Sequence, residues 1–203
     1  MSHNEPARIA VRRIRSAFLA AFVTALVFVS ATLIGVVTVQ WVGPALTSSS
    51  SAAGAVRRGV RVFDEESPAV TNLDPDLLRA LRQAAREAAK DSVEIVVNSG
   101  WRSPEYQKLL FRQAVSKYGS EVKAERWVAT ADTSSHVSGH AVDIGPSRAT
   151  AWLSKHGAKY RLCQIYRNEP WHYELRPKAI KDGCPPMYAD PGHDPKMQQW
   201  RHP

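Results

Sequence analysis

The chain has 203 residues, a formal net charge of +8 and two cysteines. Its length leaves room for one sizeable folded core, so a second core is not expected. Positive charge would suit nucleic acid, but the sequence has no basic stripe interleaved with aromatic residues, so we expect no nucleic-acid partner.

The N-terminal region is predicted to be a membrane anchor. The stretch 17–39 contains no charged side chain, and a helix of that length spans about 34 Å, enough to cross a hydrocarbon core of about 30 Å. Arginines precede it, so residues 1–16 are expected in the cytoplasm and everything after the anchor outside the cell. The alternative is a cleaved signal peptide, whose apolar core is normally about 7 to 15 residues long. We therefore expect a single-pass membrane protein.

The remaining chain divides into three parts by composition. Residues 40–68 contain Gly-Pro, four consecutive serines and several arginines without an apolar period, which predicts a flexible stalk. Residues 69–190 are expected to form the folded domain, and residues 191–203 an irregular tail. Outside a cell, the basic charge would suit an anionic polymer, although it could also serve only solubility.

Hydrophobic periodicity and capping residues divide the folded domain into helices and strands. A first helix begins at Asp74–Pro75, and its apolar residues share one face through Ala88. Strands and helices then follow in irregular order with short connections, which predicts an α+β fold with a small antiparallel sheet flanked by helices. The other expected elements are a strand over 93–97, a helix capped by Ser103 and running to about Lys117, a strand over 141–144, a helix capped by Ser147 and ending before Gly157, and strands over 162–166 and 171–175.

Two segments of the folded domain carry residues of the types that coordinate zinc in proteins. In the first, His136 and Asp143 are seven positions apart, across a turn at Gly139, and in the second Glu169 lies three residues before His172. Two imidazoles and one carboxylate form a three-ligand zinc site with one open position, as in catalytic zinc centres. The additional glutamate can accept the proton of the attacking water. These residues predict a zinc hydrolase.

Several neighbouring residues have competing interpretations. Strand alternation places His140 and Asp143 on opposite faces, so His140 is expected to point away from the metal. Arg102 ends the first strand and is well placed to stabilise an oxyanion, and the alternative is a surface salt bridge. Cys163 and Cys184 are not in a Cys-x-x-Cys pattern. In an oxidising exterior they are expected to pair, and two unpaired thiols are the alternative.

With these residues, the sequence resembles the zinc D-alanyl-D-alanine carboxypeptidases and dipeptidases of bacterial cell walls, including the vancomycin-resistance type. Their fold is shared with the Hedgehog signalling domain. Three motifs carry the resemblance: Ser-x-His-x-x-Gly-x-Ala-x-Asp over 134–143, Glu-Pro-Trp-His over 169–172, and Gly-aromatic-Arg-Ser followed by Gln over 100–107. The resemblance extends from about residue 73 to residue 175. The segment before Glu169 is shorter than in many relatives, which carry a long hairpin there.

The resemblance implies a role for each motif residue, with Zn²⁺ as the cofactor. It implies a D,D-carboxypeptidase that removes the terminal D-Ala from peptidoglycan stem peptides, with the number of subunits left open. An L,D-carboxypeptidase and a peptidoglycan endopeptidase share this chemistry and differ in pocket shape. The implied roles are zinc ligation by His136, Asp143 and His172, proton transfer by Glu169, transition-state stabilisation by Arg102, and substrate binding by Gln107, Ser134 and Trp171.

Two other classes of function stay open on the sequence alone. A binding module could keep the fold and hold wall peptides without cleaving them, but every role that the hydrolysis needs is filled here. A serine D,D-peptidase would use Ser-x-x-Lys, which Ser120 and Lys123 match. The companion Ser-Asp-Asn and Lys-Thr-Gly motifs are absent from the sequence, so we interpret this match as coincidence.

Overall fold

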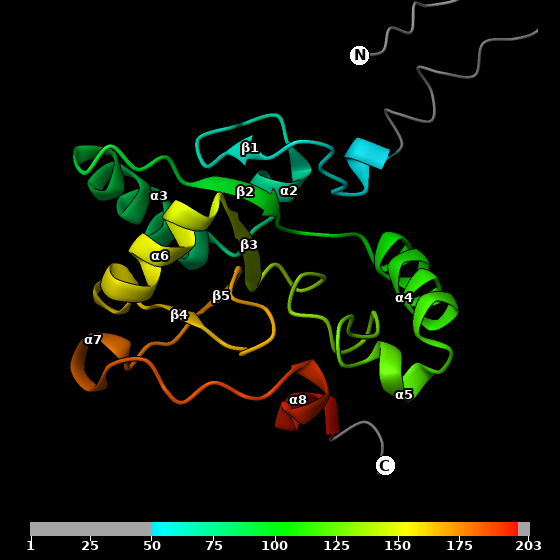
Figure 1. Ribbon diagram of the computed structural model, residues 1–203. Helices are drawn as coiled ribbons and strands as arrows, with labels where there is room; N and C mark the ends of the chain where they lie inside the picture. Colours follow the sequence, from blue (N-terminus) through cyan, green and yellow to red (C-terminus); the bar gives the residue numbers. More distant parts are fainter. Residues whose placement is uncertain (1–49, 199–203) are drawn as a thin grey trace, which may run out of the picture. The chain divides into compact units, whose positions relative to one another are not determined.

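The computed structural model describes residues 50–198, which are organised around a five-stranded antiparallel sheet (Figure 1). The expected cytoplasmic segment and membrane anchor, residues 1–39, lie outside the described residues. Within the described part of the chain, no helix is both long and apolar enough to cross a bilayer. In spatial order, the strands are β1 (Val60–Arg61), β2 (Val96–Ser99), β3 (Ala141–Gly145), β5 (His172–Leu175) and β4 (Leu162–Gln164).

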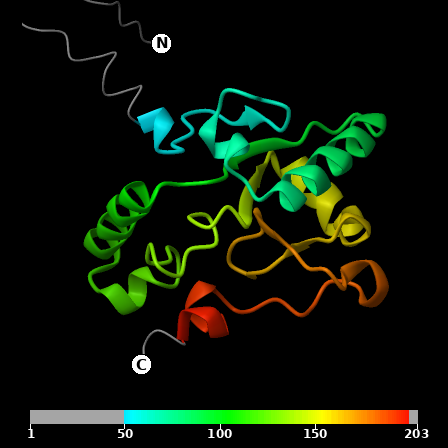
Figure 2. The ribbon, with the colours of Figure 1, turned by 180° about the vertical axis from the view of Figure 1, so that it is seen from behind.

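Two helices, α3 (Pro75–Lys90) and α6 (Ser147–His156), cover one face of this sheet (Figures 1 and 2). The Asp74 side chain caps α3 by accepting hydrogen bonds from the backbone N–H groups of the first turn. A 3-10 turn, η1 (Gly157–Tyr160), continues from α6. The apolar face of α3 packs with inward-facing strand residues, so the hydrophobic core lies between these helices and the sheet.

Two more helices, α4 (Pro104–Tyr118) and α5 (Glu121–Ala124), follow β2 and lie away from α3 and α6 (Figures 1 and 2). Ser103 caps α4 as expected, and Ser120 caps α5 by accepting a hydrogen bond from the backbone N–H of Lys123. The Ser-x-x-Lys match is therefore a helix start. The remaining short helices are α2 (Pro68–Thr71), α7 (Ala179–Asp182), η2 (Pro191–His193) and α8 (Pro195–Gln198).

The stalk predicted over residues 40–68 is wrong for its second half. Val60 in β1 pairs with Val97 in β2, and Val62 is 1% exposed within the main core. The backbone oxygen of Ala53 also accepts a hydrogen bond from the N–H of Ser103. The folded domain therefore begins before residue 69, because a two-residue strand can be held by its ladder partners although it is too short to show a period.

The described part of the tail predicted over residues 191–203 contains η2 and α8, so it is more regular than expected. Tyr188 forms a parallel bridge with Tyr166, and η2 and α8 follow it. Asp190, directly before the tail, and Asp194, within it, are both buried, each with a polar partner. Composition predicts that such residues are exposed, but a buried carboxylate is tolerated where it is paired and hydrogen-bonded.

Some element boundaries also differ from the prediction. Val93 and Ile95 are buried in the core, yet the paired strand begins only at Val96. Ser147 is the first residue of α6 rather than its cap, and Pro146 occupies the cap position without a side-chain hydrogen bond. The hydrophobic pattern of the sequence located these segments correctly. The residues at which the elements begin and end depend on backbone partners that the sequence does not reveal.

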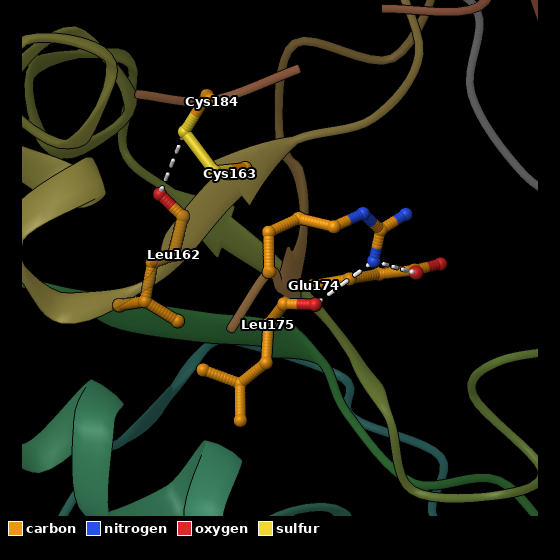
Figure 3. Close-up of a disulfide and its surroundings, with 6 residues drawn as sticks. Leu162, Cys163, Glu174, Leu175 and Cys184 are labelled. Atoms are coloured by element: carbon orange, nitrogen blue, oxygen red, sulfur yellow. Dashed lines mark hydrogen bonds and ion pairs between the residues drawn. A yellow bond between two sulfur atoms is a disulfide. The ribbon is translucent and has the colours of Figure 1, made fainter. Parts of the chain in front are cut away.

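Cys163 and Cys184 form a disulfide, as expected, which joins β4 to the segment after α7 (Figure 3). The two cysteines are 21 positions apart. We expect Cys184→Ser to lower the free energy of unfolding by about 3 kcal/mol, because the unfolded chain regains the entropy of the opened loop. Urea unfolding of the oxidised protein measures this loss, and reduced wild type should match the variant. Equal unfolding midpoints for oxidised wild type and variant would contradict the prediction.

Candidate metal centre

Two adjacent strands place the first pair of predicted ligands side by side. Asp143 in β3 is directly opposite His172 in β5 in the ladder register. Because strand residues alternate between faces, their neighbours Val142 and Tyr173 point into the hydrophobic core. Asp143 and His172 therefore lie on the opposite face of the sheet, away from α3 and α6.

The third predicted ligand, His136, lies on the loop that leads into β3. Gly139 turns this loop with φ +74°, and a Cβ atom there would lie only 2.7 Å from the carbonyl oxygen of Asn72. The Nδ1 atom of His136 lies 2.8 Å from the carbonyl oxygen of Gly100. A carbonyl only accepts hydrogen bonds, so Nδ1 carries the proton and Nε2 is free to bind a metal.

The distances between ligand atoms fit a zinc ion. The Oδ1 atom of Asp143 lies 3.4 Å from Nε2 of His136 and 3.2 Å from Nδ1 of His172. One ligand atom from each of the three residues lies within 4.8 Å of the other two. Ligands about 2.0–2.1 Å from a tetrahedral zinc ion are separated by about 3.3 Å, so the site needs little adjustment to hold it.

The protonation states of two of the three predicted ligands, Asp143 and His136, also favour metal binding. Burial opposes ionisation of Asp143, but His136, His172 and Arg102 outweigh it and hold the pKa of this carboxyl well below its usual value. Burial, followed by the charge of Arg102, lowers the pKa of His136. The carboxylate is therefore ionised and His136 neutral, which are the forms that coordinate a metal.

Glu169 lies beside the cluster of three predicted ligands, next to His172. Its Oε2 atom is 3.8 Å from Nδ1 of His172, and its backbone oxygen accepts a hydrogen bond from the N–H of His172, which closes the Glu-Pro-Trp-His turn. Burial raises the pKa of this carboxyl to about 7, although the charge of His172 opposes the change. A carboxylate with a pKa near neutrality is suited to accept and return a proton.

Arg102 lies in the site and not in a surface salt bridge, because its side chain is only 14% exposed. The guanidinium donates hydrogen bonds to Ser99 and Gln107 and an ion-paired one to Asp143. Three of its five N–H donors are thereby used, which leaves two for a substrate. Gln107, predicted to bind substrate, is buried and also donates to the backbone oxygen of Ala129, so it fixes Arg102 in place.

A cleft of about 430 Å³ surrounds these groups. The other two predicted substrate residues line it: Ser134 is buried, and Trp171 is 41% exposed. The cleft extends away from the ligands to Tyr118 and Trp127, whose rings stack with centroids 5.9 Å apart. His140 is not part of the cluster: its ring accepts or donates a hydrogen bond with Ser138 and is mostly exposed, as predicted.

Sequence reasoning missed two residues that contact the predicted ligand His172. The Nε2 atom of His172 lies 3.3 Å from Oε1 of the buried Glu174, and the ring of Tyr166 packs 4.9 Å from its ring. Burial lowers the pKa of His172, but hydrogen bonds to Asp143 and Glu174 outweigh it and raise that pKa to about 9. Strand alternation could have identified Glu174, which is two positions after His172 and on the same face. No local signal marks Tyr166.

Known proteins share both the sequence and the fold of this region. The family model VanY, described as D-alanyl-D-alanine carboxypeptidase, matches residues 70–178. A curated D-alanyl-D-alanine carboxypeptidase of Enterococcus faecalis is 31% identical over 121 residues, which are 47% of this chain and 44% of that protein. The chain therefore spans less than half the length of this relative.

Solved structures extend the comparison. VanYB in complex with D-alanine-D-alanine is 25% identical, with a TM-score of 0.51 over 55% of this chain and 78% of that one. A mutant of the vancomycin-resistance D,D-pentapeptidase VanY in complex with Zn(II) is also 25% identical, with a TM-score of 0.49 over 61% of this chain and 80% of that one. The predicted α+β fold with a small antiparallel sheet is thus shared with VanYB.

Proposed function

The chain belongs to the VanY family of D-alanyl-D-alanine carboxypeptidases, and we propose that it is a zinc-dependent D,D-carboxypeptidase that removes the terminal D-Ala from peptidoglycan stem peptides. One observation carries this proposal: His136, Asp143 and His172 converge within 4.8 Å beside the buried carboxylate of Glu169. This set contains three metal ligands and a proton acceptor that is not one of them.

The residues of the cleft divide the work of peptide hydrolysis between them. A zinc ion held by the three ligands would acidify water and polarise the scissile carbonyl. Glu169 accepts the proton of the attacking water and passes it to the nitrogen of the departing D-Ala. The free N–H groups of Arg102 are available to hold the carbonyl oxygen as negative charge develops on it.

The residues that line the cleft support a peptide substrate. A carboxypeptidase substrate has a single residue beyond the scissile bond and the rest of the peptide before it. Lys117, Tyr118 and Trp127 line the cleft and offer a cation and two stacked aromatic rings. These groups suit the carboxylate-bearing remainder of a stem peptide.

We propose further that the protein is anchored by residues 17–39 with its catalytic domain outside the cell. The uncharged apolar run in the sequence supports the anchor. The Cys163–Cys184 disulfide supports an oxidising compartment for the domain. Protease treatment of intact protoplasts tests this, because an external domain should be digested and a cytoplasmic one protected.

The direct test of the activity uses the full-length protein in detergent, because a fragment that starts near residue 67 would lack β1. The protein is incubated with a stem pentapeptide ending in D-Ala-D-Ala, with zinc or with a chelator, and the products are identified by mass. Loss of one D-Ala that stops with chelator is the expected result. Cleavage only of a tetrapeptide or of a cross-link would show an L,D-carboxypeptidase or an endopeptidase. Binding of the peptide without cleavage would instead show a wall-peptide-binding module.

A further inference from the structure

We propose that the C-terminal segment 190–196 is a positioning element that holds the metal ligand His172 from two sides. This segment lies beyond the family match, which ends at residue 178. The Cys163–Cys184 disulfide and the bridge between Tyr166 and Tyr188 attach the chain that leads to it. The inference rests on the metal site of the proposed function, but it concerns residues that no motif of that site includes.

The first contact reaches His172 through Glu174. The Nζ atom of Lys196 on α8 lies 3.3 Å from Oε2 of Glu174, whose other oxygen lies 3.3 Å from Nε2 of His172. Arg176 also donates a hydrogen bond to the carboxylate of Glu174. Figure 3 shows Glu174 next to Leu175, with this hydrogen bond as a dashed line. Glu174 is almost completely buried, so the hydrogen-bond donors available to its carboxylate are these protein groups.

The second contact reaches the face of the same imidazole through Tyr166. The hydroxyl of Tyr166 donates a hydrogen bond of 3.0 Å to Oδ2 of the buried Asp194. The Tyr166 ring then packs against the His172 ring, with centroids 4.9 Å apart. The other oxygen of Asp194 accepts from the backbone N–H of Lys196, so both contacts begin in one turn of chain.

A third interaction fixes this turn to the body of the domain. The buried carboxylate of Asp190 accepts a hydrogen bond of 2.9 Å from Nε of Arg126. Arg126 in turn is joined to the loop before Glu169, because its backbone oxygen accepts from the side chain of Asn168. The segment is therefore connected to the walls of the cleft as well as to the metal ligand.

These contacts determine the orientation of the His172 ring. A metal on Nδ1 requires the remaining proton on Nε2, and Glu174 is the acceptor for that proton. Rotation of the ring would break the hydrogen bond to Glu174 and the packing on Tyr166. Outer-shell partners of this kind typically change metal affinity by about 10- to 100-fold when they are removed. The segment thus acts on zinc affinity through His172, without itself touching the metal.

The test measures zinc affinity of the full-length protein by competition with a chromophoric chelator, together with the visible spectrum of the Co²⁺-substituted protein. Lys196→Ala and Glu174→Gln should each weaken zinc binding by about 10- to 100-fold and shift the Co²⁺ bands. Because Lys196 acts through Glu174, the double variant should bind zinc no more weakly than Glu174→Gln alone. Lys196→Arg should retain wild-type affinity.

Lys181→Ala, on the exposed helix α7, is the matched control and should change neither readout. Lys196 is 57% exposed, so its replacement leaves the fold intact even if Glu174→Gln does not. Wild-type affinity and spectrum in Lys196→Ala, or additive effects in the double variant, would overturn the proposal. Wild type that binds zinc without cleaving any peptide would refute only the proposed function. Wild type that binds no zinc would refute both.

Discussion

Replacing Glu169 with glutamine is expected to leave zinc bound while lowering turnover by about 10²- to 10⁴-fold, the usual contribution of a positioned proton acceptor. The ligand cluster consists of other residues, so the metal site itself is unchanged by the substitution. Glutamine has nearly the same size as glutamate but cannot take up the proton of the attacking water. The expected result is thus an enzyme that binds zinc and substrate normally and performs the chemical step slowly.

Two measurements check this expectation. Zinc content is determined by mass spectrometry of the purified protein, and release of D-Ala from the pentapeptide gives kcat and KM separately. A loss confined to kcat would show that Glu169 acts in the chemical step and does not contribute to substrate binding. Glu105→Gln on the outer surface of α4 is a matched control that should keep full activity. Near-normal turnover of Glu169→Gln would remove the general-base role from this residue.

The three ligands and Glu169 could be predicted because their positions depend on short stretches of chain. His136 and Asp143 are separated by one glycine turn and the start of one strand, and Glu169 and His172 by one proline turn. Within such stretches, alternation and turn chemistry determine which side chains share a face. Residue types and spacing therefore carried most of the information about the site.

The groups that support the site depend instead on distant contacts. Lys196 reaches Glu174 across 22 positions, and Tyr166 reaches Asp194 across 28. No periodicity links residues so far apart, and the polar tail looks irregular by composition. β1 was missed for a similar reason, since its two residues owe their conformation to the partner strand β2. Sequence reasoning predicted the residues that form the candidate metal cluster and missed the distant residues that contact them.

Replacing His172 with alanine is expected to abolish both metal binding and activity. His172 lies between three carboxyl groups of the site, because its ring contacts Asp143, Glu169 and Glu174. Its removal would leave two protein ligands, and it would also leave the buried carboxyl groups of Glu169 and Glu174 and the partly buried carboxyl group of Asp143 without the imidazole between them. The loss of zinc affinity should therefore exceed the 10- to 100-fold typical of an outer-shell change.

Zinc content and affinity of His172→Ala are measured together with peptide cleavage, and thermal unfolding in chelator reports the metal-free fold. His140→Ala is the matched control: it lies in the same motif as His136, its ring is mostly exposed, and it should bind zinc and cleave peptide like wild type. Stoichiometric zinc in His172→Ala would exclude this residue from the ligand set. It would also remove the target of the C-terminal segment, because contacts through Glu174 and Tyr166 can influence the metal only if the imidazole between them binds it.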